Sequence, residues 1–477
     1  MRFELIVIGS GPAGRRAAIQ AAKLGRSVLV VENRVRVGGV SVHTGTIPSK
    51  TLRETVLNLS GWRERGFYGL AYRVKKDIEG KDLGARLRMT LDFEIDVLEH
   101  QFARNGVRTI AGLARFLDPH RIQVGAEGQS EIYEADRVVI AVGTKPYRPP
   151  SIPFDDHAIV DSDTLVEQVR VPRSLTVVGA GVIGLEYATI FSALDVPVTI
   201  VEPRSNFLEF IDREILDEFV HDLRKRGVSF RLGCRVDQVE LDAAGWPVAL
   251  LGDGRRIRTE MLLYAAGRVG ATEGLGLENI GVPVDSRGRI AVQPDTFQTV
   301  QPHIYAAGDV IGFPSLASTS MEQGRIASCH AFGAPIAEAP VFFPYGIYAV
   351  PEISTVGLTE EEVRQKKIAY ECGVARFRET SRGHIMGLQS GMMKMIFGLA
   401  DRRLLGVHIV GEGATELIHI GQAVLNLGGT VDYFVENTFN YPTLAEAYKI
   451  AALDAFNRMP PALLAVEDIA PARIAEA

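Results

Sequence analysis

Two short glycine-rich runs have the residue types and spacing needed to hold phosphate groups. Residues 5–14 read LIVIGSGPAG and residues 175–184 read LTVVGAGVIG. In a GxGxxG run, the first glycine permits a tight turn, the second lets the backbone approach a pyrophosphate, and the third lets a helix pack closely on a strand. The runs therefore predict two dinucleotide sites, built on Gly9, Gly11 and Gly14, and on Gly179, Gly181 and Gly184.

The segments that must position these glycines also occur twice. Each run follows a short apolar, β-branched segment and precedes a helix-like stretch. A second apolar segment then ends on Glu32 or Glu202, in both cases 23 residues after the first glycine of the run. A carboxylate at that place accepts hydrogen bonds from a ribose. One pattern alone could be an ordinary glycine-rich turn, but two with equal spacing favour a duplicated βαβ unit. Two dinucleotides in one chain suggest FAD, which stays bound, and a nicotinamide nucleotide, which exchanges.

This order of patterns predicts an α/β protein with two Rossmann-like dinucleotide-binding domains and a third, C-terminal α+β domain. Residues 50–105 read as a helical insertion in the first domain. The expected segments are the first part of the FAD-binding domain (1–150), the NAD(P)-binding domain (151–270), the second part of the FAD-binding domain (271–340), the C-terminal domain (341–460) and a Pro/Ala-rich tail (461–477).

The composition is that of a globular protein. The 477 residues are 46% hydrophobic and 23% charged, with a net charge of −6, which disfavours disorder and nucleic-acid binding through bulk positive charge. The three cysteines, Cys234, Cys329 and Cys372, lie too far apart in sequence to indicate a disulfide framework or a metal site. We expect a cytoplasmic protein with no membrane span, no bound metal and no nucleic-acid partner.

Several motifs resemble those of the glutathione reductase and dihydrolipoamide dehydrogenase group of flavoproteins. They are GSGPAG, GAGVIG, AVGTKP, AAGRVG and YAAGD, and the resemblance covers nearly all of residues 3–458. It implies that the last ~120 residues build a homodimer or a higher homo-oligomer. It also implies an FAD site at Gly9, Gly11, Gly14, Glu32, Gly39, Ser41, Thr46, Lys50, Gly112, Thr144, Asp309 and Ala317, with Asp309 on the ribitol. The NAD(P) site would comprise Gly179, Gly181, Gly184, Glu202, Arg204 and Gly267.

The sequence departs from this family at its redox centre. The family carries a disulfide in a segment GGxCxxxGCxPSK, and here the two cysteine positions are Ser41 and Thr46. A hydroxyl is far less acidic than a thiol of pKa ~8.5, so neither residue replaces a thiolate. The histidine that serves the thiol is replaced by Tyr441, whereas Glu446, which would orient that histidine, remains. Reduction of a substrate through a dithiol is therefore not expected.

The flavin half of the family's machinery is retained. By resemblance, Lys50 and Glu186 pair beside flavin N5, where a cation stabilises negative charge on the flavin. Tyr441 and Glu446 would lie near the partner subunit's flavin, either shaping the nicotinamide pocket or only packing the interface.

The runs GTIPSK, DVIGFPSLAS, ATELIHIGQAV and TFNYPTLAEAY are similar to family members that exchange hydride between nicotinamide nucleotides. The resemblance thus implies ping-pong transfer between NADPH and NAD⁺ through FAD. Two alternatives stay open: a quinone or dye reductase, and a redox-sensing flavoprotein with little turnover.

Glu202 and Arg204 have opposite consequences for nucleotide choice. A carboxylate suits the free 2′-hydroxyl of NAD(H), and at ~4 Å it would repel a 2′-phosphate by about 4 kcal/mol per unit charge at an effective ε of ~20. A charge-assisted contact from Arg204 would offset about 1.5–3 kcal/mol of this.

Overall fold

The computed structural model describes residues 1–126, 129–336 and 342–460. The tail expected at 461–477 lies outside the described residues. The chain forms two compact units: unit 1 comprises residues 1–60, 75–207 and 228–339, and unit 2 comprises residues 61–74, 208–227 and 340 onward. The five segment boundaries expected from the sequence stay predictions. In the part of the chain that is described, no helix is long and apolar enough to cross a lipid bilayer.

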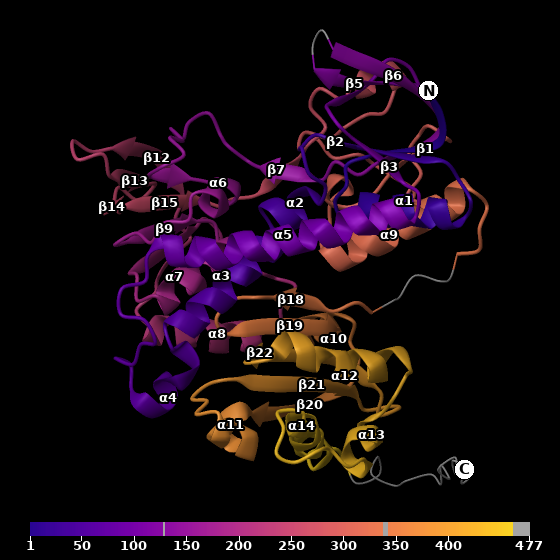
Figure 1. Ribbon diagram of the computed structural model, residues 1–477. Coiled ribbons are helices and arrows are strands. Elements are labelled where there is room, and N and C mark those ends of the chain that lie inside the picture. Colours follow the sequence, from indigo (N-terminus) through magenta and orange to yellow (C-terminus); the bar gives the residue numbers. More distant parts are fainter. Residues whose placement is uncertain (127–128, 337–341, 461–477) are drawn as a thin grey trace. The chain divides into compact units, whose positions relative to one another are not determined.

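The first glycine run begins in β1, an inner strand of a mostly parallel sheet in unit 1 (Figure 1), and continues past the carboxyl end of that strand. The strand order is β3-β2-β1-β6-β5-β4, and β17 also pairs with β6. The parallel strands are β1 (Arg2–Ile8), β2 (Val28–Glu32), β3 (Arg108–Ala111), β17 (Ile304–Ala306) and the second half of β6 (Gln129–Ile140). The antiparallel pairs join β4 (Ala114–Phe116), β5 (Arg121–Ala126) and the first half of β6.

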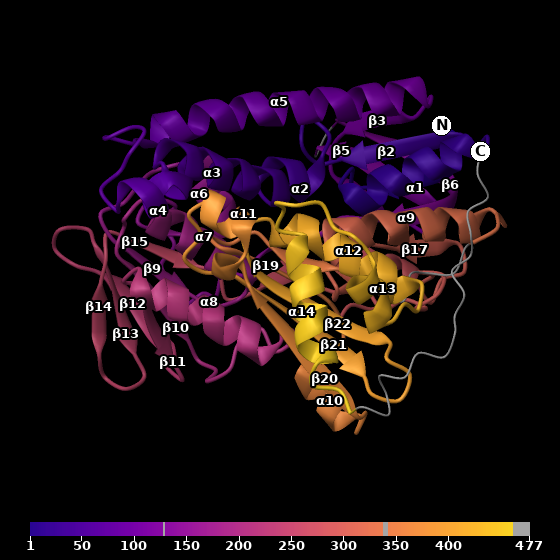
Figure 2. The same ribbon diagram turned by 90° about the horizontal axis from the view of Figure 1, so that it is seen from below.

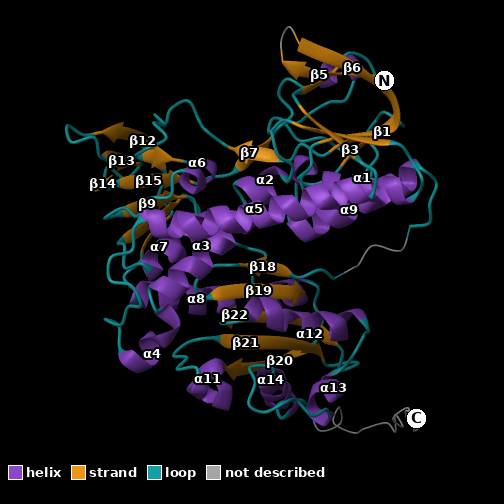
Figure 3. Cartoon of the chain, in the orientation of Figure 1, coloured by secondary structure: helices purple, strands orange, loops and turns teal. Residues whose placement is uncertain are grey.

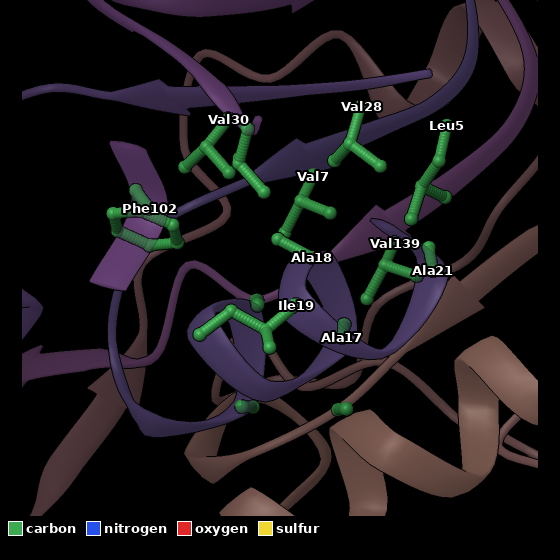
Figure 4. Packing of buried hydrophobic residues seen from close by; sticks show 14 of the residues in the cluster. Leu5, Val7, Ala17, Ala18, Ile19, Ala21, Val28, Val30, Phe102 and Val139 are labelled. Carbon is green, nitrogen blue, oxygen red and sulfur yellow. The ribbon is translucent and has the colours of Figure 1, made fainter. Parts of the chain in front are cut away.

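Side-chain alternation gives this sheet two buried faces. Successive residues of a strand point to opposite faces, so an uninterrupted apolar strand is covered on both sides. Leu5, Val7, Val28, Val30 and Val139 pack on one face against three helices (Figure 4). Those helices are α1 (Pro12–Lys23), α5 (Gly80–Arg104) and α9 (Ala317–Ala331), of which α1 and α9 lie side by side (Figures 1 and 2).

The second glycine run sits in a copy of the same arrangement. Its sheet has the order β11-β10-β9-β15-β8, and all its pairings are parallel. Its strands are β8 (Ile159–Val160), β9 (Leu175–Val178), β10 (Val198–Glu202), β11 (Ser229–Leu232) and β15 (Met261–Tyr264). The helix α7 (Val182–Ala193) and β10 repeat α1 and β2 with a constant offset of 170 residues. The duplicated βαβ unit expected from the sequence is confirmed.

Smaller elements complete unit 1. The helical insertion expected at 50–105 is present as α3 (Thr46–Leu59) and α5, after the short helix α2 (Gly39–His43). The 3₁₀ turn at Trp62–Glu64 and α4 (Arg65–Tyr68), which lie between them in sequence, belong to unit 2. The remaining elements are α6 (Ser162–Glu167), the antiparallel sheet β12 (Val236–Leu241), β13 (Pro247–Leu251) and β14 (Arg256–Arg258), and the antiparallel pair β7 (Thr144–Pro146) and β16 (Arg268–Gly270).

Unit 2 is built on one antiparallel sheet of order β18-β19-β22-β21-β20 (Figure 3). Its strands are β18 (Tyr345–Ile347), β19 (Glu352–Gly357), β20 (Tyr370–Arg376), β21 (Met392–Gly398) and β22 (Leu404–Gly411). Its helices include α8 (Arg213–Lys225), α10 (Glu360–Gln365), α11 (Ser381–Ile385), α12 (Ala414–Asn426), α13 (Val431–Glu436) and α14 (Glu446–Phe456).

A buried lysine on one strand of unit 2 forms ion pairs with carboxylates at the starts of two helices of the same unit. Lys394, on β21, is 1% exposed. Its Nζ lies 3.0 Å from Asp212, which caps α8, and 3.2 Å from Glu214, and it also bonds Glu360 at the start of α10. A buried charge is tolerated when it is paired and hydrogen-bonded, and this one has carboxylates on two other elements.

Candidate active site

The first and third glycines of each run are required by the packing of the chain itself. Gly9 has φ +102°, and an added Cβ would lie 2.3 Å from the carbonyl oxygen of Ala141. A Cβ on Gly14 would lie 1.9 Å from the carbonyl oxygen of Gly9. Gly179 and Gly184 repeat these contacts, at 2.7 Å and 2.2 Å. Both turns therefore have the close strand–helix approach that the sequence predicts.

The second glycines have a different explanation. Gly11 and Gly181 have φ values of −63° and −75°, which any residue adopts. Within the described residues, a Cβ on Gly181 would meet nothing within 4 Å, and one on Gly11 would meet only the Cα of Gly39, at 4.0 Å. Packing within the chain does not call for glycine at either place. The space in front of α1 and α7 thus fits a group that approaches the backbone from outside, as a pyrophosphate does.

The two strand-end carboxylates are held in matching cradles. Glu32 is 5% exposed and accepts the backbone N–H groups of Ser10 (3.0 Å) and Arg34 (3.1 Å). Glu202 is 2% exposed and accepts those of Ala180 (2.8 Å) and Arg204 (3.2 Å). These bonds turn each carboxylate toward its own glycine turn, where the ribose of a dinucleotide is expected.

The Arg204 side chain distinguishes the second cradle from the first. Its Nε lies 2.7 Å from Oε1 of Glu202 and its Nη2 lies 3.3 Å from Oε2, a forked ion pair. Burial by itself raises the pKa of Glu202, but the bonds from Arg204 and Ala180 outweigh it, and the pKa lies below its usual value. Arg204 thus offsets the Glu202 charge that would repel a 2′-phosphate.

Lys50 and Glu186 meet as the resemblance implies. Lys50 is on α3, and its Nζ lies 2.7 Å from both carboxylate oxygens of Glu186, which is on α7 and 4% exposed. Ser49 also donates to Glu186, at 3.3 Å. The pair therefore joins the helix that begins within the altered redox motif to the helix of the second glycine run.

The altered motif lies beside the first glycine turn. A Cβ on Gly39 would lie 2.7 Å from the Cα of Gly11. Ser41 donates to the carbonyl oxygen of Gly38 at 3.1 Å, and Thr46 is the first residue of α3. All three cysteines are free thiols, and each lies far along the chain from this segment. Nothing in this segment can form a disulfide.

A third cluster surrounds Asp309. Burial raises the pKa of Asp309, although bonds from Ser320 and Thr144 and the charge of Arg268 act against this rise. Arg268 donates to the side chain and to the carbonyl oxygen of Thr144, both at 2.8 Å. Sequence reasoning missed Arg268, although it directly follows Gly267 in the quoted AAGRVG run. It also missed Ser10, whose hydroxyl bonds Glu32 and accepts the Gly38 N–H at 2.8 Å.

The other predicted cofactor residues lie on the same unit. The Gly112 N–H donates to the carbonyl oxygen of Glu32 at 2.8 Å. Ala317 is the first residue of α9, after the turn that contains Asp309. Gly267 has φ +122°, and a Cβ there would meet no atom of the described chain within 4 Å. Their roles toward a cofactor stay predictions.

Tyr441 and Glu446 lie in unit 2. Tyr441 is 69% exposed, and its hydroxyl lies 2.5 Å from that of Ser381. Glu446 begins α14, and its Oε2 is buried with no hydrogen-bond partner in the described part of the chain. Tyr441 therefore uses Ser381 as its partner, and the carboxylate that would orient a histidine is left with an open acceptor.

Known proteins share this organisation over nearly the whole chain. The "Soluble pyridine nucleotide transhydrogenase" of Mycobacterium tuberculosis is 50% identical over 459 residues, which are 96% of this chain and 98% of that protein. The protein of the same name from Marinomonas sp. is 43% identical over 461 residues, or 96% and 99% of the two chains.

Among solved structures, LpdA from Mycobacterium tuberculosis superimposes with a TM-score of 0.86 at 28% identity, over 95% of this chain and 99% of that one. The HOCl-induced flavoprotein disulfide reductase RclA from Escherichia coli gives 0.85 at 26% identity, over 94% and 99%. Residues 3–324 match the pattern named pyridine nucleotide-disulphide oxidoreductase, and residues 343–452 match the dimerisation domain of the same name. The chain belongs to the pyridine nucleotide-disulphide oxidoreductase family.

Proposed function

We propose that this protein transfers hydride between NADPH and NAD⁺ through bound FAD, without a redox disulfide. The observation that carries the proposal is the intact Lys50–Glu186 pair, with Lys50 the last residue of a motif whose two cysteine positions are Ser41 and Thr46. The relatives named soluble pyridine nucleotide transhydrogenase, at 43–50% identity, support it.

The first glycine turn and its neighbours would hold FAD. The open approach to Gly11 suits its pyrophosphate, the cradled Glu32 suits the adenosine ribose, and Asp309 suits the ribitol hydroxyls. The remaining residues of this proposed site are Gly9, Gly14, Gly39, Ser41, Thr46, Lys50, Gly112, Thr144 and Ala317. When bound, FAD supplies a group that takes a hydride from one nicotinamide and yields it to another.

The second glycine turn, with Gly181 and Glu202, would hold each nicotinamide nucleotide in succession, and Gly179, Gly184 and Gly267 would complete the site. Glu202 accepts from the 2′-hydroxyl of NAD(H). For NADP(H), Arg204 could leave its bond to Glu202 and contact the 2′-phosphate, because one guanidinium can serve either anion. The forked pair thus gives one site two states, as a transhydrogenase requires.

Lys50 would act as an electrostatic group beside the flavin. Its ammonium favours negative charge near it, and Glu186 fixes its position and offsets its charge. Tyr441 and Glu446 would contribute from the partner subunit of a homodimer, which the match of residues 343–452 to a dimerisation domain supports. Higher assembly and a cytoplasmic location stay predictions of the sequence.

Steady-state kinetics tests this function. A single site that serves both nucleotides in turn predicts parallel double-reciprocal lines when NADPH and NAD⁺ are varied, with one NADH formed per NADPH consumed. Intersecting lines would contradict the ping-pong scheme. NADPH oxidation that needs a quinone and yields no NADH would assign the protein to quinone reduction.

A further inference from the structure

A cationic cavity lies on unit 1 between the helices α1 and α5. It has a volume of about 400 Å³ and is lined by Arg15, Arg16, Ile19, Lys23, Gln101, Arg104 and Asn105. The lining thus combines four cationic side chains with two amides and one apolar group. Ile19 also packs with Phe102 in the core beneath, which fixes the two helices against each other (Figure 4).

The cations of this cavity are not used in ion pairs. Within residues 1–126, 129–336 and 342–460, none of the four forms a salt bridge. By contrast, Arg36 binds Asp96 and Glu99 on the same helix α5, at 2.6 Å and 3.0 Å. The partly buried Arg15 donates to the sulfur of Met321 at 3.7 Å, and sulfur is a weak acceptor. A guanidinium has five N–H donors, so most of those on Arg15 remain available to a ligand.

Helix dipoles explain only half of the cluster. Lys23 and Arg104 lie in the last turns of α1 and α5, where a cation is favoured. Arg15 and Arg16 lie about one turn after the start of α1, where the helix dipole does not favour a cation. The nearby carboxylates compensate only through space. Glu94 acts electrostatically on Arg15, and Glu322, which bonds Arg325, also acts electrostatically on Arg16. In the described part of the chain, neither carboxylate forms an ion pair with a cation of the cavity. Burial, followed by the charge of Arg16, lowers the pKa of Arg15, as expected for a partly buried cation beside another cation.

We propose that this cavity binds a phosphorylated anion with at least two negative charges, namely a pyrophosphate group, free or as part of a nucleoside polyphosphate. Arginines bind phosphate oxygens in a forked geometry, and the amides of Gln101 and Asn105 can donate as well. The volume lies within the range usual for small-ligand sites. Along α1 the lining runs from Arg15, about 6 Å beyond Gly11, to Lys23, about 18 Å beyond it, so most of the cavity lies away from the proposed FAD turn.

Isothermal titration calorimetry on the FAD-loaded enzyme tests this site. Pyrophosphate is titrated directly, and ADP is titrated into enzyme saturated with NAD⁺, so that the nicotinamide site is filled. We expect one site per chain for pyrophosphate. Equal affinity for both probes would identify the phosphates as the ligand, whereas tighter ADP binding would show that the nucleoside also contacts the cavity wall.

Matched variants locate the binding. R15Q/R104Q removes two lining charges, and we expect it to weaken binding by about 100-fold or more. R86Q/R88Q removes two exposed charges elsewhere on α5 and should change the affinity less than about twofold. If the flavin spectrum of R15Q/R104Q shows that this variant misfolds, R16Q/K23Q is used in its place. Absence of heat with both probes, or equal losses in the lining and control variants, would overturn the proposal.

Discussion

The Nζ atom of Lys50 lies 2.7 Å from both carboxylate oxygens of Glu186, although 136 residues separate them in the chain. Glu186 is buried, whereas the Lys50 side chain is 25% exposed. The Lys50 side chain is therefore partly accessible, while its charge is held beside Glu186. If Lys50 lies beside the flavin, this geometry gives it an electrostatic role that needs no thiol.

Replacing Lys50 by methionine should slow flavin reduction by NADPH and destabilise the protein. The change leaves the Glu186 carboxylate buried without its charged partner, which costs about 1.5–3 kcal/mol. Thermal unfolding and stopped-flow absorbance at the flavin band measure the two effects. The double variant K50M/E186Q should be less destabilised than the sum of its single variants, because the buried charge is gone. Strict additivity would contradict a coupled pair.

Changing the Glu202–Arg204 pair should alter nucleotide preference in opposite directions. R204Q leaves Glu202 charged against a 2′-phosphate, so kcat/KM for NADPH should fall by about 10- to 100-fold more than that for NADH. E202A should raise the NADPH/NADH ratio of kcat/KM. An unchanged ratio in both variants would remove the pair from the ribose site.

Neutralising Asp309 should stabilise the flavin-free protein at neutral pH while weakening FAD binding. Because burial raises its folded-state pKa above the unfolded value of about 3.9, its contribution to stability is greatest below that value and falls as the pH rises through the folded pKa. D309N should therefore raise the Tm at pH 8 and have little effect at pH 4. A lower Tm at pH 8 would show that the charged carboxylate is compensated within the chain.

Alkylation of all three thiols should leave transhydrogenation intact. Cys329 is buried, and burial raises the pKa of Cys372 to about 12, so both thiols react slowly in the folded protein. The protein is therefore alkylated after brief unfolding, and the triple variant C234S/C329S/C372S serves as an alternative to alkylation. Turnover per bound FAD is the readout. Loss of turnover in both the alkylated protein and the triple variant, with flavin retained, would mean that a thiol takes part.

Removing the buried ammonium of unit 2 should be among the most destabilising single changes. K394M leaves Asp212 and Glu360 without their common partner, and breaking a buried ion pair typically costs about 3–5 kcal/mol. Urea unfolding measures the loss. The matched variant K449M removes a half-buried lysine on α14 of the same unit. In the described part of the chain this lysine bonds only a backbone carbonyl, at 3.0 Å, so the change should cost less than about 1 kcal/mol.

The two repeated βαβ units could be predicted, because the spacing between the first glycine and the strand-end glutamate is the same in both. The equal distance from Gly9 to Glu32 and from Gly179 to Glu202 requires the same strand–turn–helix–strand path, and the structure has it. Apart from the Lys50–Glu186 pair, which the family resemblance implies, contacts made by single long side chains could not be predicted. Arg204 turning back to Glu202, and Tyr441 bonding Ser381, depend on rotamers and loop positions that no period in the sequence encodes.

The cationic cavity shows a similar limit. Arg15, Arg16 and Lys23 read as an ordinary solvated helix face, and only the end of α5 places Arg104 against them. Arg104 lies far from these residues in sequence, and no motif surrounds it. The sequence therefore could not predict that the end of α5 lies beside α1.

The central claim is that hydride passes through the flavin and needs no thiol, and a two-step stopped-flow experiment tests it most directly. The enzyme is reduced anaerobically with NADPH, excess nucleotide is removed, and NAD⁺ is added while absorbance at the flavin band and at 340 nm is followed. We predict rapid return of the flavin band with about one NADH formed per FAD. No reoxidation by NAD⁺, with rapid reoxidation by a quinone, would contradict the account.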